Sequence, residues 1–123
     1  MSSLRSRAGA VLACAVLTGG ATACGGAQAQ LIVTAENLAF TPERAELTAD
    51  QVVQVVFRNR DVGVPHGLLI ATRTSGILPR EIASVEVLTG PAERTFELPA
   101  LAAGPYLFSC PVHPTMQVEA DVL

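Results

Sequence analysis

The sequence contains little of what nucleic-acid-binding proteins and most enzymes use at their sites. It has two histidines, three cysteines and no lysine, so its eight positive charges are all arginines. From Gln30 onward, six arginines and eleven acidic residues give a formal net charge of −5. A phosphate backbone is bound by clusters of lysine and arginine, so we do not expect a nucleic-acid partner.

Common catalytic patterns are missing as well. We find no Ser/His/acid set, no pair of carboxylates with a claim to a site and no glycine-rich loop suited to phosphate. Both histidines are needed for another role, argued below, and none remains as a general base. The sequence therefore does not predict an enzyme.

Charged residues are scarce, at 15% of the chain, whereas 50% of the residues are hydrophobic. This composition excludes disorder and predicts a single domain with a sizeable core. We find no internal repeat and no low-complexity segment.

The first 29 residues predict an export signal. Arg5 and Arg7 precede an apolar run over residues 8–17, and small residues follow. The run is shorter than the roughly 20 residues that a membrane-spanning helix needs. We therefore expect an exported protein, periplasmic or otherwise extracytoplasmic, whose domain covers residues 30–123 and is a monomer.

Two cleavage sites fit the small-x-small rule, and both stay open. Cleavage before Cys24 would give a lipoprotein with a short tether, attached to the membrane only through the lipid on that cysteine. Against it, position 21 holds alanine where lipoprotein signals usually hold leucine. Cleavage after Ala29 would discard Cys24 with the signal. In either case Cys110 is the one thiol left for the domain, and a lone thiol in an oxidising compartment needs protection or a purpose.

Residues 30–123 alternate between strand-like runs and turn signals. Strands are predicted at residues 31–40, 45–48, 51–59, 66–71, 85–88, 94–98, 106–110 and 118–123. Pro79 begins a predicted short helix over residues 79–83. The period of two places Tyr106, Phe108 and Cys110 on one face, toward the core. Seven or eight short strands predict an all-β fold, an antiparallel Greek-key β-sandwich.

One loop near the C-terminus concentrates metal-binding chemistry. Cys110, His113 and Met116 are each three residues apart, and the prolines at 111 and 114 stiffen the chain between them. A thiolate, an imidazole and a thioether suit copper better than zinc, magnesium or calcium, because a thioether is a poor ligand for hard or borderline cations. One more imidazole would complete the set, and His66 is the other histidine of the chain.

From about residue 31 to the C-terminus the chain resembles the cupredoxins, the family of type 1 (blue) copper proteins. The strand pattern carries the resemblance, together with His66 at a strand entrance and a Cys110, His113 and Met116 loop similar to the short ligand loop of amicyanins. It implies an eight-stranded sandwich with one mononuclear copper near one end. His66, Cys110 and His113 would be the strong ligands and Met116 the weak axial one. The implied function is single-electron transfer by Cu(I)/Cu(II) cycling, with redox partner proteins docking transiently near His113.

Parts of the same loop also fit other metal functions. The sequence Cys-Pro-Val-His-Pro also resembles a short heavy-metal-binding motif of metal-efflux proteins, but that motif occurs in a much smaller domain. A binuclear copper centre would need a second cysteine in the loop. A copper-delivery protein of the cell envelope could use the same four ligands. It would be expected to carry further methionines or histidines for metal handover, and the domain has only Met116, which favours electron transfer.

The chain departs from the cupredoxin pattern directly after the first histidine, where Gly67 replaces the usual Asn, Ser or Thr. We hypothesise that the backbone N–H groups of Gly67 and Val112 donate to the Cys110 sulfur and raise the reduction potential. An apolar collar for docking partners is expected around His113. Its members are Val62, Val64, Pro65, Pro111, Val112 and Pro114.

Overall fold

The computed structural model describes residues 28–123. The predicted signal therefore lies outside the described residues except for its last two positions, and so does Cys24. Nine strands are formed, and no helix of residues 28–123 is long and apolar enough to cross a membrane. In chain order they are β1 (Ala29–Glu36), β2 (Ala39–Thr41), β3 (Arg44–Leu47), β4 (Val53–Asn59), β5 (Pro65–Thr72), β6 (Glu81–Thr89), β7 (Ala92–Leu98), β8 (Gly104–Ser109) and β9 (Gln117–Val122).

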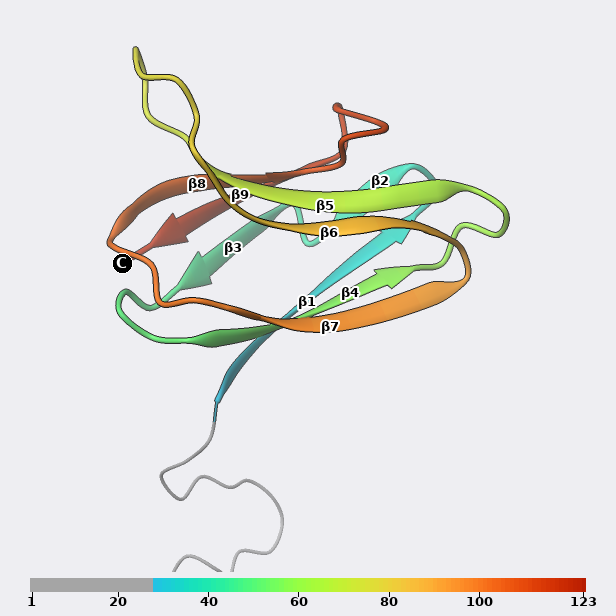
Figure 1. Ribbon diagram of the computed structural model, residues 1–123, viewed down its shortest axis with the longest axis horizontal. Coiled ribbons are helices and arrows are strands. Elements are labelled where there is room, and N and C mark those ends of the chain that lie inside the picture. The colour runs from blue at the N-terminus through green and yellow to red at the C-terminus, as the bar shows by residue number, and fades with distance from the viewer. Residues whose placement is uncertain (1–27) are drawn as a thin grey trace, which may run out of the picture.

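The strands form two sheets that pack face to face, which confirms the predicted all-β sandwich (Figure 1). One sheet has the order β2-β1-β4-β7 and the other the order β3-β9-β8-β5-β6. The predicted antiparallel order is wrong at two pairs, because β1 and β4 run parallel and so do β3 and β9. After β1 the chain turns back as β2 and crosses to the other sheet as β3, and β4 then returns beside β1 in the same direction as β1.

The predicted first strand, residues 31–40, is divided in two. Asn37 and Leu38 have φ angles of 56° and 60°, so the chain turns back there and β2 pairs with the end of β1. This turn raises the number of strands to nine. The apolar positions change phase between Ala35 and Leu38, and this shift is the sequence signal of the turn that the prediction of one continuous strand overlooked.

The predicted helix over residues 79–83 is wrong. β6 begins at Glu81, and residues 81–85 pair with β5 as the edge of the five-stranded sheet. Backbone hydrogen bonds to a neighbouring strand outweigh a weak local preference for helix. Residues 73–80 form an exposed loop at one end of the sandwich (Figure 1).

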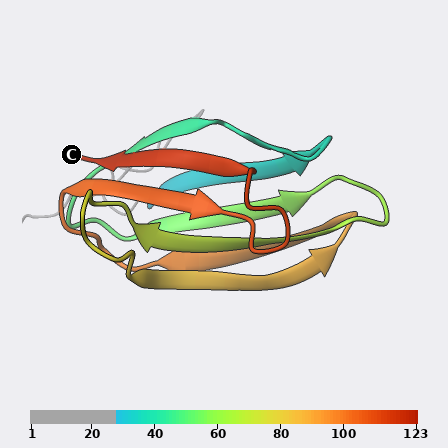
Figure 2. The ribbon, with the colours of Figure 1, turned by 90° about the horizontal axis from the view of Figure 1, so that it is seen from above.

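The core lies between the sheets and is closed at one end by the predicted metal-binding segments. Phe40 and Phe57 pack edge to face at 6.2 Å between ring centroids. Tyr106 and Phe108 of β8 and Cys110, which follows it, are 6%, 0% and 1% exposed, which confirms that all three face the core. The β8–β9 connection, residues 110–116, folds back beside the strands at the end where β4 passes into β5 (Figure 2).

Candidate metal centre

Three segments bring the predicted ligands together. His66 is the second residue of β5, Cys110 follows the last residue of β8, and His113 lies in the loop before β9. His66 and Cys110 are fully buried, whereas His113 is half-buried. Residues 44 positions apart in the sequence thus meet because β5 and β8 are hydrogen-bonded neighbours.

The donor atoms of these residues face one another. Nδ1 of His66 lies 3.2 Å from Nδ1 of His113, and each lies 3.9 Å from Sγ of Cys110. A triangle with sides of 3.2, 3.9 and 3.9 Å has its centre about 2.1 Å from every corner. Imidazole nitrogen and thiolate sulfur bind a transition metal such as zinc at roughly 2.0 to 2.3 Å, so one ion fits among the three atoms.

Met116 closes the ligand loop from its other end. Its N–H donates to the His113 carbonyl at 2.9 Å, and its carbonyl accepts from the Cys110 N–H at 3.2 Å. The side chain is 2% exposed, so the thioether is held inside the protein at the end of the loop that carries Cys110 and His113. A buried sulfur on this short loop, which two backbone hydrogen bonds close, suits the weak axial position of a copper site.

The hypothesis about the sulfur hydrogen bonds is wrong in this structure. Among the described residues, the backbone N–H that donates to Cys110 Sγ belongs to His113, at 3.3 Å, and not to Gly67 or Val112. The glycine has a packing reason. A Cβ at position 67 would lie 3.3 Å from both Pro111 Cγ and the Val85 carbonyl oxygen, so these neighbours leave little room for a side chain there.

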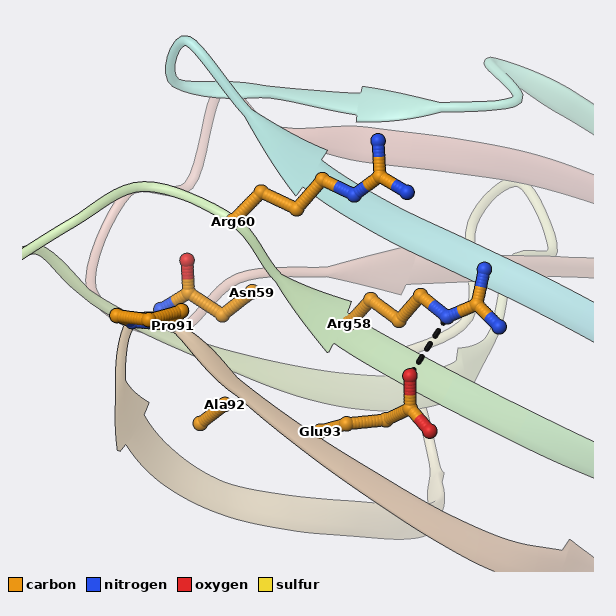
Figure 3. Close-up of a pocket in the computed structure, with 6 residues that line it drawn as sticks. All are labelled: Arg58, Asn59, Arg60, Pro91, Ala92 and Glu93. Carbon is orange, nitrogen blue, oxygen red and sulfur yellow. Dashed lines mark hydrogen bonds and ion pairs between the residues drawn. The ribbon is translucent and has the colours of Figure 1, made fainter.

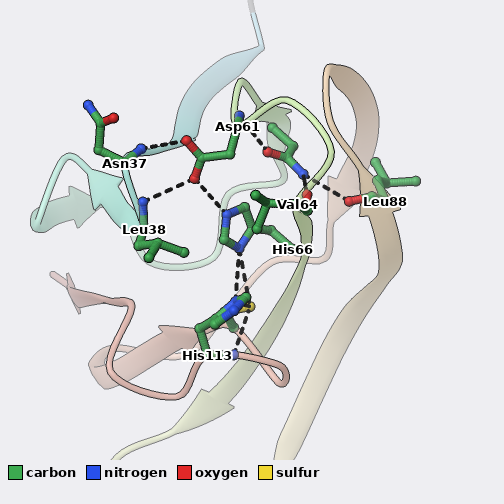
Figure 4. A network of polar contacts seen from close by, with 9 residues as sticks. Asn37, Leu38, Asp61, Val64, His66, Leu88 and His113 are labelled. Atoms are coloured by element: carbon green, nitrogen blue, oxygen red, sulfur yellow. Dashed lines mark hydrogen bonds and ion pairs between the residues drawn. The ribbon is translucent and has the colours of Figure 1, made fainter.

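Asp61 is a site residue that the sequence analysis missed. Its Oδ2 lies 2.8 Å from Nε2 of His66, on the side of the ring opposite His113 (Figure 4). The N–H of Leu38 and then the hydrogen bond to His66 hold the pKa of the Asp61 carboxyl below its ordinary value. An ionised carboxylate only accepts hydrogen bonds, so the imidazole proton is on Nε2 and the Nδ1 lone pair points to the metal position.

Asn59 shapes the loop that carries Asp61 and leads to His66. Its Nδ2 donates to the carbonyls of Val64 at 2.8 Å and Leu88 at 2.9 Å, and its Oδ1 accepts from the Asp61 N–H at 2.9 Å. The residue is 1% exposed, and these three bonds satisfy its buried amide. The signal that could have revealed it is a polar residue at the buried end of a strongly apolar strand.

An open hollow lies near this loop. It is lined by Arg58, Asn59, Arg60, Pro91, Ala92 and Glu93 (Figure 3). Arg58 Nε is paired with Glu93 at 2.6 Å, and the Asn59 side chain is used in the bonds above. No nucleophile and no histidine line it.

Among residues 28–123, two imidazoles and one thiolate converge at the end of a two-sheet β-sandwich, and this set of donor atoms is that of a metal-binding protein. The chain matches the model of the cupredoxin-like domain over residues 8–120 and belongs to this family. No curated protein matches the chain.

Solved structures share the fold. Auracyanin A, a blue copper protein from the green thermophilic photosynthetic bacterium Chloroflexus aurantiacus, is 21% identical, with a TM-score of 0.68 over 79% of this chain and 100% of its own. Rusticyanin from Thiobacillus ferrooxidans is 17% identical, with a TM-score of 0.64 over 76% of each chain. A reduced Cu(I) form of an amicyanin mutant is 16% identical, with a TM-score of 0.56 over 79% of this chain and 85% of its own. At these identities the likeness establishes the fold.

The predicted site residues are therefore positioned to form one type 1 copper site. His66, Cys110 and His113 converge as expected, and Met116 is buried at the end of their loop. The heavy-metal motif does not account for the structure, because its five residues lie in a full sandwich whose β5 supplies His66.

Proposed function

We propose that this protein carries single electrons between redox partner proteins through one copper ion held by His66, Cys110, His113 and Met116. The observation that carries the proposal is the triangle of two Nδ1 atoms and one Sγ, with sides of 3.2, 3.9 and 3.9 Å. When bound there, copper would supply the Cu(I)/Cu(II) couple. The protein holds nitrogen and soft sulfur ligands in one arrangement that serves both oxidation states.

The different burial of the two imidazoles supports electron exchange through His113 and not through His66. His66 is 0% exposed and is covered on its far side by Asp61, whereas His113 is half-buried in a surface loop. Among the described ligand residues, His113 therefore offers the shortest path from the metal position to a docked protein.

The surface around His113 supports transient docking. Val62 is 79% exposed and Val112 42% exposed, and the prolines at 65, 111 and 114 are exposed as well. Leu38, which the sequence analysis did not include, is 56% exposed and lies near the same ligand loops (Figure 4). Apolar contacts of this kind suit the small interfaces of redox encounters.

The oxidised protein's visible spectrum tests the proposal. We expect a strong thiolate-to-copper band and a reversible one-electron couple in voltammetry, and Cys110→Ser should abolish the band. Bound Cu(I) with no such band and no reversible couple would instead support copper delivery. Met116 is the one methionine of residues 30–123, and this scarcity supports electron transfer over delivery.

The place of action is proposed from the sequence. Residues 1–29 have the charge and hydropathy pattern of an export signal, so we place the protein outside the cytoplasm, either free or attached by a lipid on Cys24. Intact mass of the protein from the membrane fraction decides between the two forms, because lipidation adds the mass of the acyl chains.

A further inference from the structure

We infer that Asp61 is a positioning residue of the copper site, which orients His66 and lowers the reduction potential through its negative charge. The inference rests on the proposed copper-binding function and deepens it. It starts from the 2.8 Å contact between Asp61 Oδ2 and Nε2 of His66, the imidazole that is 0% exposed.

Asp61 is held in place by the turn between β1 and β2, which lies in the sheet opposite that of His66. Its Oδ1 accepts from the Asn37 N–H at 2.6 Å, and its Oδ2 accepts from the Leu38 N–H at 3.0 Å as well as from His66 (Figure 4). Three N–H groups thus converge on one carboxylate whose side chain is only 12% exposed. The carboxylate cannot rotate away from His66 without breaking the other two bonds.

This arrangement also explains an unusual backbone conformation. Leu38 has a φ of 60°, in the left-handed region that side chains other than those of Gly, Asn and Asp rarely adopt. Hydrogen bonds from Asn37 and Leu38 to Asp61 offset the strain of the turn. The alternative is that Asp61 only stabilises this turn, and the experiment must distinguish that structural role from an effect on the copper site.

A fixed anion beside a ligand imidazole has a predictable effect on copper. It holds the ring in the tautomer whose Nδ1 is free to bind metal, and it makes that nitrogen a stronger donor. Negative charge favours the more highly charged Cu(II) over Cu(I). Removing an outer partner of a ligand typically costs about 10- to 100-fold in metal affinity. We expect Cu(II) affinity to fall about tenfold more than Cu(I) affinity, which raises the potential by about 59 mV.

The experiment compares Asp61→Asn with the double variant Asp61→Asn/Leu38→Gly. The single variant should have a lower melting temperature and a higher potential than the wild type. Glycine accepts a positive φ without strain, so the double variant should recover most of the melting temperature. The inference requires its potential to stay high. A potential that returns to the wild-type value together with the melting temperature would show that Asp61 only supports the turn.

A matched control separates the effect of a charge beside the site from the effect of the protein's net charge. Asp50→Asn removes one negative charge before β4, whereas Asp61 follows β4, and seven strand residues of roughly 3.3 Å each lie between them. Asp50 has a φ of 60°, which asparagine tolerates. The reduction potential of Asp50→Asn should equal that of the wild type. A rise equal to that of Asp61→Asn would overturn the role of Asp61 at the copper site.

A copper-free measurement makes the inference independent of the proposed function. In nitrogen-15 NMR of the metal-free protein, His66 should be protonated at Nε2, and Asp61→Ala should increase the share of the Nδ1-protonated tautomer. An unchanged tautomer in this variant would count against the orienting role. Failure of the proposed function would appear separately, as a wild-type protein with no reversible copper couple.

Discussion

At the scale of single residues, the donor set is built from side chains that differ in exposure. Cys110 and His66 are buried, with 1% and 0% of their surface exposed, and His113 is half-buried. The sulfur accepts a hydrogen bond from the backbone of its own loop, the His113 N–H at 3.3 Å. The electron density of the thiolate is therefore adjusted from within the loop that carries it.

Met116→Leu tests the axial position. The two side chains are similar in volume, so the fold should lose less than about 1.5 kcal/mol. A lost thioether donor disfavours Cu(II), so we expect the potential to rise by tens of millivolts, on the order of one tenfold step of 59 mV. Voltammetry measures it. Leu98→Met, a core site with 0% exposure, is the control, and an unchanged potential in Met116→Leu would show that the thioether is not a ligand.

At the scale of elements, the site depends on how loops are fastened to strands. The loop between β4 and β5 is held by Asn59, which bonds to its start and its end and also to the Leu88 carbonyl of β6. Gly90, after β6, has no room for a side chain, since a Cβ there would lie 2.3 Å from the Asp61 carbonyl oxygen. The connection between β6 and β7 is thus packed directly against Asp61, the residue that contacts His66.

Asn59→Ala is expected to destabilise the protein by about 2 to 4 kcal/mol. The change leaves the carbonyls of Val64 and Leu88 without their donor, and each such loss costs about 1 to 3 kcal/mol when the group stays buried. Urea unfolding of the copper-free protein measures the free energy. Gln54→Ala, which removes an exposed side-chain bond to Gln30, should stay within about 0.5 kcal/mol of the wild type. Equal effects of the two variants would contradict the fastening role.

At the scale of the whole molecule, the sandwich separates two apolar surface regions. The collar around His113 includes Val62 and Val112, and the loop of residues 73–80, with Ile77 exposed at 66%, lies at the opposite end of β5 (Figure 1). The two ends allow the docking role of the collar to be tested with equal changes of charge.

Val62→Glu should slow electron self-exchange about tenfold. Two collars must touch for self-exchange, and a pair of carboxylates between them repels and resists desolvation. Line broadening in NMR spectra of mixed oxidised and reduced protein measures the rate. Ile77→Glu adds the same charge at the other end and should change the rate little. An unchanged rate in Val62→Glu with an unchanged spectrum would reject the docking role.

Copper binding should stabilise the folded state. The ligands come from β5 and from the β8–β9 loop, so the assembled site exists only in the folded protein. With free copper about 1,000-fold above its dissociation constant, the gain is about 4 kcal/mol. Thermal unfolding at increasing copper concentration measures it, and Cys110→Ala should weaken the dependence. A melting temperature independent of copper in the wild type would contradict a site formed on folding.

The sequence alone was sufficient to predict the sandwich and to single out His66, Cys110 and His113, whose donor atoms converge. Strand alternation reports burial directly, and three metal-binding side chains within seven residues need no tertiary information to be noticed. The tertiary structure decided what depends on pairing and crowding. It decided the two parallel strand pairs, the strand at residues 81–89 in place of a helix, and the turn at Leu38. It also placed Asp61 against His66, because a carboxylate five residues before a histidine meets it only when a turn from the other sheet holds it there.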